Sequence, residues 1–90
     1  MGTALITLKL MPNSPEANLE AIKEQAKETI EQTNGKNVRF EEIPVAFGLK
    51  AIQTFFDLDE AHELEPIENA LGEIKNISSV QFVDMRRAFG

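Results

Sequence analysis

The sequence predicts an α+β sandwich in which two helices cover one face of a four-stranded antiparallel sheet. Hydrophobic residues alternate in four segments, which is typical of strands, and recur every three to four residues in two others, which is typical of helices. These segments follow the order β-α-β-β-α-β, which is the ferredoxin-like arrangement, and right-handed crossovers place both helices on the same face. A chain of 90 residues is too short for two cores, so we expect a single domain over residues 1–90.

The first half of the chain holds a strand and the longer helix. Residues 4–11 alternate strictly, and their apolar row consists of Ala4, Ile6, Leu8 and Leu10. After a proline-containing break, Asn18 is a suitable N-cap for a helix that Asn34 and Gly35 end. The predicted buried stripe of this helix is Leu19, Ile22, Ala26 and Ile30.

The middle of the chain predicts a hairpin. Residues 37–45 contain Pro44, which fits an edge strand, and the adjacent Glu41 and Glu42 could mark a bulge. Residues 47–57 are apolar in both alternating rows, as in a central strand. For the sheet as a whole, we expect the usual order to place the first and last strands in the centre.

The second half repeats the pattern of a helix followed by a strand. Residues 57–63 are acidic and predict a loop, and Pro66 marks the start of the second helix. The apolar stripe of that helix is Ile67, Ala70, Leu71 and Ile74, and we expect Lys75 in its last turn. Residues 79–85 form the predicted last strand, and the remaining residues, RRAFG, form a tail.

Composition excludes several classes of function. A net charge of -6 opposes non-specific binding of nucleic acid or anionic membranes, and no cysteine is present to form a disulfide or a thiolate metal site. The apolar runs are shorter than a membrane span, and the N-terminus lacks the features of a signal peptide. We therefore expect a soluble cytoplasmic protein.

The residues show no pattern typical of an active site. The single His62 lies among acidic residues, but the spacing and glycine of a calcium loop are missing, so a solvated loop is the better interpretation. The chain has no nucleophile motif and no glycine-rich phosphate loop. We expect no metal, no cofactor and no enzymatic activity.

Two features invite a functional interpretation. The turn PVAFG carries an aromatic residue, Phe47, where polar residues are usual, and the C-terminal tail places Arg86, Arg87 and Phe89 on an otherwise acidic chain. Arginine and aromatic residues are favoured at protein interfaces. Alternatively, Phe47 caps the core and the arginines only increase solubility, and the residues alone leave both interpretations open.

The blocks ITLKLMP (6–12), NLEAIKE (18–24), IPVAFGLKAIQ (43–53) and SVQFVDMRR (79–87) resemble, in order and spacing, the beta subunit of translation elongation factor 1 in its short archaeal form. The chain is also similar to the C-terminal exchange domain of the eukaryotic subunit. The resemblance covers nearly the whole chain, and its most specific part is the IPVAFGLK block.

This resemblance implies guanine-nucleotide exchange on elongation factor 1-alpha, the GTPase that carries aminoacyl-tRNA. The aromatic of the FG turn, which lies at the GTPase contact in that family, corresponds to Phe47. The eukaryotic domains also direct a penultimate lysine toward the magnesium site, but its place here is near Gly90 and no lysine follows Lys75. Archaeal members commonly have an Arg-Arg pair, so Arg86 and Arg87 are candidates for the cation, with Lys50 and Phe89 in support.

Two alternatives remain at this stage. A small ferredoxin-like ligand-sensing module would use its apolar sheet face to form oligomers or bind a metabolite, whereas we expect an exchange factor to be monomeric when free. An RNA-binding module would stack bases on Phe82 and Phe55 or Phe56, but its basic motif is absent, so we expect no direct nucleic-acid binding.

Overall fold

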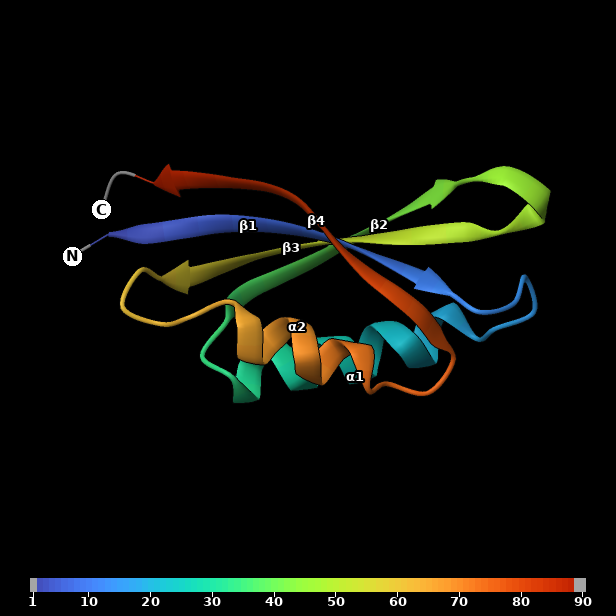
Figure 1. The fold of residues 1–90 in the computed structure, drawn as a ribbon, viewed down its shortest axis with the longest axis horizontal. Coiled ribbons are helices and arrows are strands. Elements are labelled where there is room, and N and C mark those ends of the chain that lie inside the picture. The colour runs from blue at the N-terminus through green and yellow to red at the C-terminus, as the bar shows by residue number, and fades with distance from the viewer. Residues whose placement is uncertain (1, 89–90) are drawn as a thin grey trace.

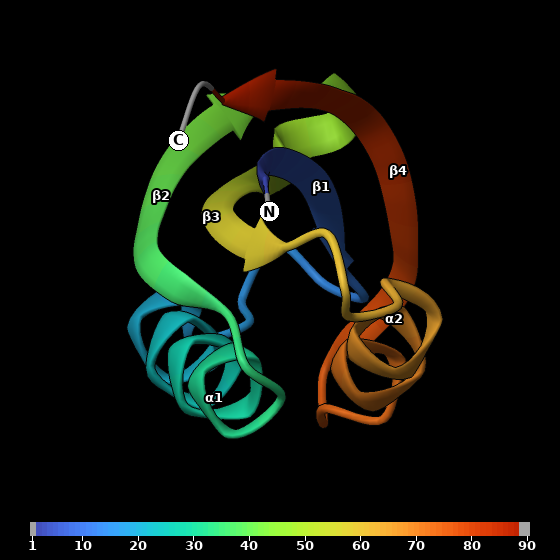
Figure 2. The same ribbon diagram turned by 90° about the vertical axis from the view of Figure 1, so that its left-hand side faces the viewer.

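The computed structural model describes residues 2–88 and places helices and strands in the predicted order (Figure 1). The strands are β1 (Thr3–Pro12), β2 (Lys36–Pro44), β3 (Lys50–Asp59) and β4 (Ile77–Ala88). The helices are α1 (Leu19–Gln32) and α2 (Glu65–Gly72), and a short 3-10 turn, η1 (Ala46–Gly48), joins β2 to β3. Both helices lie on the same side of the strands (Figure 2), which confirms the α+β ferredoxin-like fold.

The order of the strands differs from the prediction in one respect. The sheet has the order β2-β3-β1-β4, so β1 and β3 are central and the last strand, β4, is an edge strand. The hairpin returns β3 to the space between β2 and β1, and β3 suits that position because its adjacent residues Ala51 and Ile52 are both fully buried. An edge strand can leave one side uncovered, which fits the exposed apolar residues of β4.

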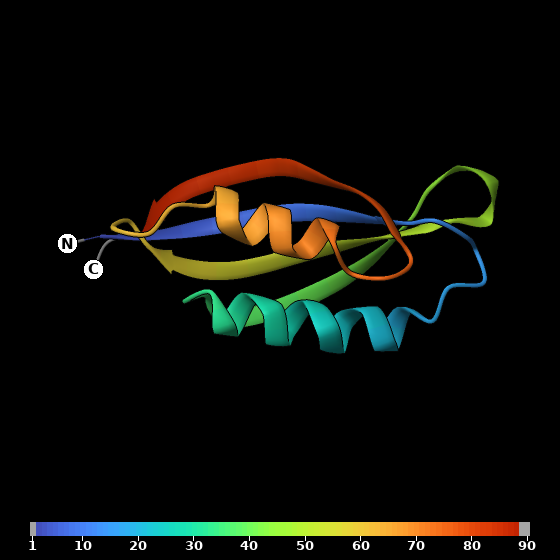
Figure 3. The same cartoon turned by 60° about the horizontal axis from the view of Figure 1, so that its bottom comes forward.

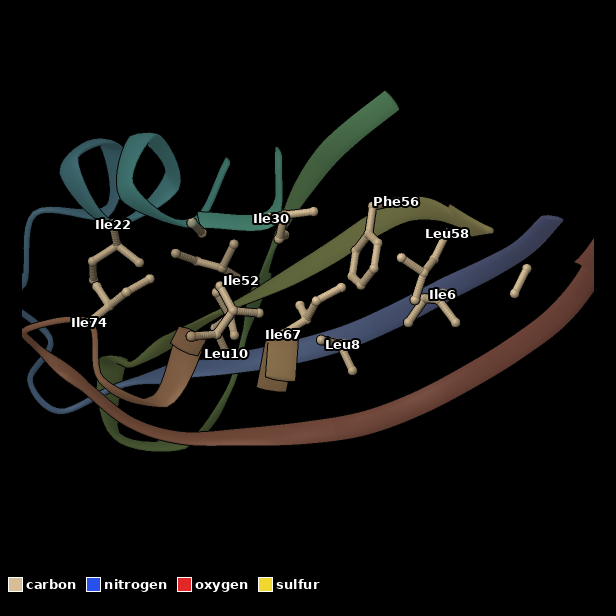
Figure 4. Close-up of a cluster of buried hydrophobic side chains, with 13 residues drawn as sticks. Ile6, Leu8, Leu10, Ile22, Ile30, Ile52, Phe56, Leu58, Ile67 and Ile74 are labelled. Atoms are coloured by element: carbon tan, nitrogen blue, oxygen red, sulfur yellow. The ribbon is translucent and has the colours of Figure 1, made fainter. Parts of the chain in front are cut away.

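The core lies between the sheet and the two helices (Figure 4). The alternating row predicted for β1 is buried and faces the helices, as does one row of β3, and the core includes Ile6, Leu8, Leu10, Ile22, Ile30, Ile52, Phe56, Leu58 and Ile67. Asn18 caps α1 as predicted, because its Oδ1 accepts a hydrogen bond of 3.2 Å from the Ala21 backbone N–H. No helix within residues 2–88 is long and apolar enough to cross a membrane.

Two local predictions were wrong. The irregular register of β2 lies between Lys36 and Arg39, where Asn37 has a positive φ of 54°, while Glu41 and Glu42 are in regular register. Helix α2 ends at Gly72, so Lys75 lies beyond its last turn. The reason is that residues 73–76 turn back to start β4, and Asn76 takes a left-handed φ of 75°.

Two strands are longer than the sequence pattern suggested. β3 continues to Asp59, beyond the predicted start of the acidic loop, because Asp57 and Asp59 pair with Leu5 and Thr3 of β1. β4 likewise runs to Ala88, which lies opposite Thr3. The arginines that we expected in a tail therefore belong to a strand.

Candidate functional site

The tip of the β2–β3 hairpin presents a single aromatic side chain to solvent. The Val45 N–H donates to the Leu49 carbonyl at 2.8 Å, and the Leu49 N–H donates to the Ala46 carbonyl at 3.2 Å, so the turn is closed by the backbone. Phe47 lies at its apex and is 94% exposed. The interpretation of Phe47 as a cap on the protein's own core is therefore wrong.

The backbone at this tip is also strained. Phe47 has φ 63° and ψ 31°, a left-handed conformation that costs a residue with a side chain roughly 1–2 kcal/mol. The next residue, Gly48, also has a positive φ, of 77°, which glycine adopts without that cost. Because the phenyl ring is exposed, it contributes little free energy of burial to the fold. Stability of the fold therefore does not account for an aromatic residue at this strained position.

Lys50 lies at the base of the same hairpin, where it begins β3 opposite Pro44. Its Nζ is 3.9 Å from Oε1 of Glu42, and the other oxygen of Glu42 accepts a hydrogen bond of 2.6 Å from Lys23 Nζ. Lys23 belongs to α1, so this carboxylate connects the helix layer to the hairpin. The structure thus brings Phe47 and Lys50 to the same end of the sheet.

The ion pair between Lys23 and Glu42 shifts both titrations. The hydrogen bond from Lys23 lowers the pKa of Glu42 below its ordinary value of 4.5, and burial opposes the shift. The same hydrogen bond raises the pKa of Lys23 above 10.5. A carboxyl whose pKa is lower in the folded state stabilises the fold above its unfolded pKa and loses that contribution as the pH falls through the folded pKa.

We therefore expect Glu42→Gln to reduce the acid sensitivity of the fold. At neutral pH the variant is less stable than wild type, and the difference shrinks below about pH 4.5 as the wild-type carboxylate becomes protonated. Urea unfolding at several values between about pH 6 and about pH 3 measures this. The exposed neighbour Glu41 gives the matched control, Glu41→Gln. Equal acid sensitivity in wild type and Glu42→Gln would show that the pair does not stabilise the fold.

Arg86 and Arg87 lie near the end of β4 and point to opposite faces of the sheet. Arg86 pairs in register with Leu5 on the open face, and Arg87 with Ala4 on the helix-covered face. Nε of Arg86 donates to Asp84 at 2.9 Å, and Nε of Arg87 donates to Glu60 at 2.7 Å. Both side chains remain more than three-quarters exposed. The predicted site residue Phe89 lies outside the described residues.

The predicted site residues do not form one cluster. The hairpin tip and the end of β4 lie at opposite ends of the long axis (Figure 1). Arg86 and Asp57 both pair with Leu5 of β1, so they lie at the same position along the strands. Asp57 is seven residues from Lys50 in β3, which corresponds to roughly 23 Å along a strand. Sequence reasoning gave no indication of this separation, because it depends on the order of the strands and on the length of β4.

The structure also reveals exposed apolar residues, of which the sequence analysis considered only Phe82, as a base-stacking residue. Phe82, Val83 and Met85 of β4 and Leu5 of β1 are each at least 39% exposed. Their alternation was visible in the sequence. The exposure of the three β4 residues fits the position of β4 at the edge of the sheet, whereas Leu5 lies on the open face of a central strand. Within residues 2–88, no three His, Cys, Asp or Glu side chains are grouped to hold a metal ion.

Comparison with known proteins identifies relatives over almost the whole chain. Residues 5–88 match the family model described as the EF-1 guanine nucleotide exchange domain. A protein named Elongation factor 1-beta from Methanocaldococcus jannaschii is 43% identical over 98% of this chain and all of its own length. Proteins of the same name from Methanosphaera stadtmanae and Methanococcus maripaludis are 41% and 34% identical, over 97% and 94% of this chain and 98% and 97% of theirs.

Proposed function

Because the chain belongs to the family of EF-1 guanine nucleotide exchange domains, we propose that it promotes the release of GDP from the GTPase elongation factor 1-alpha during polypeptide elongation. A role in nucleotide exchange follows from the family, and the identity of the GTPase is the proposed step. The observation that carries the proposal is the hairpin tip, where Phe47 is 94% exposed on a strained backbone. Such a residue suits a partner that buries it.

The proposed mechanism depends on differential binding. GDP is held in a GTPase by its phosphates and by the Mg²⁺ ion that bridges them to the protein. A factor that binds the nucleotide-free GTPase more tightly than the GDP-bound form must weaken GDP binding by the same factor. This requires complementary contacts and no general acid, base or nucleophile, so the factor acts without an active site of its own.

We assign different roles to the two ends of the sheet. Phe47 would be the apolar anchor, with Lys50 beside it, because burying an exposed aromatic ring in a partner's pocket provides binding energy. Arg86 and Arg87 would supply positive charge near the phosphates or the Mg²⁺ site, in place of the C-terminal lysine of the eukaryotic relatives. Phe89 would support them.

The separation of the two ends limits how the partner can bind. A contact with both requires a surface of the GTPase that extends over most of the 42 Å long axis of this protein. We therefore propose a two-point contact, in which the hairpin tip anchors one region of the GTPase and the arginines act on another. The two points make separable contributions, so changes at the tip should affect affinity and changes at the arginines should affect the rate of release.

The proposal is tested by comparing the affinity of this protein for elongation factor 1-alpha in its nucleotide-free and GDP-bound forms. We expect at least about tenfold tighter binding to the nucleotide-free form, which corresponds to a coupling free energy of about 1.4 kcal/mol. Isothermal titration calorimetry with an archaeal GTPase measures both affinities and the stoichiometry. Equal affinities would rule out exchange through this partner, whereas binding of single-stranded RNA or of a small metabolite would favour an alternative function.

A further inference from the structure

The β2–β3 hairpin is closed by a tight turn over residues 46–49. The Leu49 N–H donates to the Ala46 carbonyl at 3.2 Å. The two central residues, Phe47 and Gly48, have positive φ angles of 63° and 77°. Positive φ at both central positions is typical of a type I′ turn, which hairpins favour because its twist matches that of the strands. The turn lies beyond the ends of both helices (Figure 3), so its shape depends mainly on its own backbone.

The two central residues suit this turn unequally. Type I′ turns usually contain Asn-Gly, because asparagine tolerates the left-handed conformation and glycine adopts it without cost. Phe47 occupies the first central position, where an aromatic side chain is strained, whereas Gly48 is the residue that the second position favours. An L-residue with a side chain at position 48 would place two strained residues in succession. The turn therefore tolerates an aromatic residue at its apex only because glycine follows it.

Packing within the fold does not account for a glycine at position 48. Gly48 is exposed, and a Cβ built on it meets no atom within 4 Å outside its two chain neighbours. Gly35 gives the contrast, because a Cβ at that position would overlap the side chain of Ile30. The fold thus requires Gly35 for space, whereas it uses Gly48 for its backbone conformation alone.

From this geometry we propose that Gly48 is a positioning residue for nucleotide exchange: it maintains the type I′ turn that presents the Phe47 ring to the GTPase in one orientation. This inference rests on the proposed function and on Phe47 as its anchor, and it adds a residue that acts through the ring without contacting the partner. A ring held in its binding orientation loses less conformational freedom when it binds. If the turn adopts other conformations, the apparent affinity falls in proportion to the fraction of molecules that keep the type I′ turn.

The test compares two forms of Gly48→Ala, one with L-alanine and one with D-alanine introduced by chemical synthesis. Both add one methyl group, but L-alanine disfavours positive φ and D-alanine favours it. In a GDP-release assay with elongation factor 1-alpha, we expect the L form to raise the half-saturating concentration about tenfold, as when about a tenth of the molecules keep the turn. The D form should stay within about twofold of wild type. The matched control is Gly72→Ala with L-alanine, because Gly72 is also exposed with no atom within 4 Å of a built Cβ but lies in α2.

A second measurement reports the turn itself. The nuclear Overhauser effect between Hα and HN of Phe47 is strong at positive φ, so we expect it to weaken in the L form and to persist in the D form. Normal half-saturation in the L form, beside active wild type, would overturn the positioning role. Equal losses in both forms would also overturn it, because the partner would then approach Gly48 too closely for any methyl group. No acceleration by wild type would overturn the proposed function and this inference together, and circular dichroism confirms that each variant is folded.

Discussion

Replacing Phe47 by alanine is expected to reduce the efficiency of nucleotide exchange about 30-fold or more. An aromatic anchor at the centre of a contact typically contributes at least about 2 kcal/mol, and each 1.4 kcal/mol corresponds to a factor of ten. The ring is 94% exposed in the free protein, so its removal takes away no contact that supports the fold. The loss should appear as a higher half-saturating concentration of this protein in a GDP-release assay.

A second variant at the same position separates binding from stability. Phe47→Gly removes the cost of a left-handed conformation, roughly 1–2 kcal/mol, but adds an entropic cost of about 0.5–1 kcal/mol in the unfolded chain. We therefore expect the variant to be as stable as wild type or more stable by up to about 1.5 kcal/mol, and to be as impaired in exchange as Phe47→Ala. Phe82→Ala is the matched control because it removes another exposed phenylalanine. Full exchange activity in Phe47→Gly would contradict the role of an anchor.

Replacing Arg86 and Arg87 together by alanine is expected to lower the maximum rate of GDP release about 10- to 100-fold. Both side chains are largely exposed and held through Nε by Asp84 and Glu60, so their terminal nitrogens can act on an anionic site of the GTPase. Because the two residues face opposite sides of the sheet, the two single variants should have unequal effects. Stopped-flow release of fluorescent GDP at saturating protein measures the maximum rate.

A charge-preserving variant is the control for the arginines. If the role is electrostatic, the double substitution Arg86→Lys and Arg87→Lys should keep most of the maximum rate. If the role requires bidentate binding, lysine cannot replace arginine and the rate will fall as it does with alanine. A maximum rate in the double alanine variant equal to that of wild type would rule out both roles.

The predictable part of this fold depends on local patterns. The alternation in residues 4–11 predicts a strand, and Asn18 predicts the start of a helix. Both features appear in the structure as expected. The apolar rows of residues 47–57 also identified β3 correctly as a central strand. Each of these features is determined by a period of two or of 3.6 residues, or by one side chain and the backbone next to it.

The features that could not be predicted depend on contacts between distant segments. Arg86 and Arg87 belong to β4 because they pair with Leu5 and Ala4 at the other end of the chain. No sequence pattern near residue 86 indicates that pairing. The separation of the arginines from Phe47 follows from the same long-range register. The unusual composition of the PVAFG turn identified Phe47, whereas its exposure and backbone strain required the structure.

The central claim, that this protein promotes nucleotide exchange on elongation factor 1-alpha, is tested most directly by the rate of GDP release. Purified archaeal elongation factor 1-alpha is loaded with fluorescent GDP and mixed with excess GTP, with and without this protein. We predict that release becomes faster as the protein concentration rises and reaches a maximum, as expected for a factor that binds and then dissociates. An unchanged rate of release at micromolar concentrations of the folded protein would contradict the account.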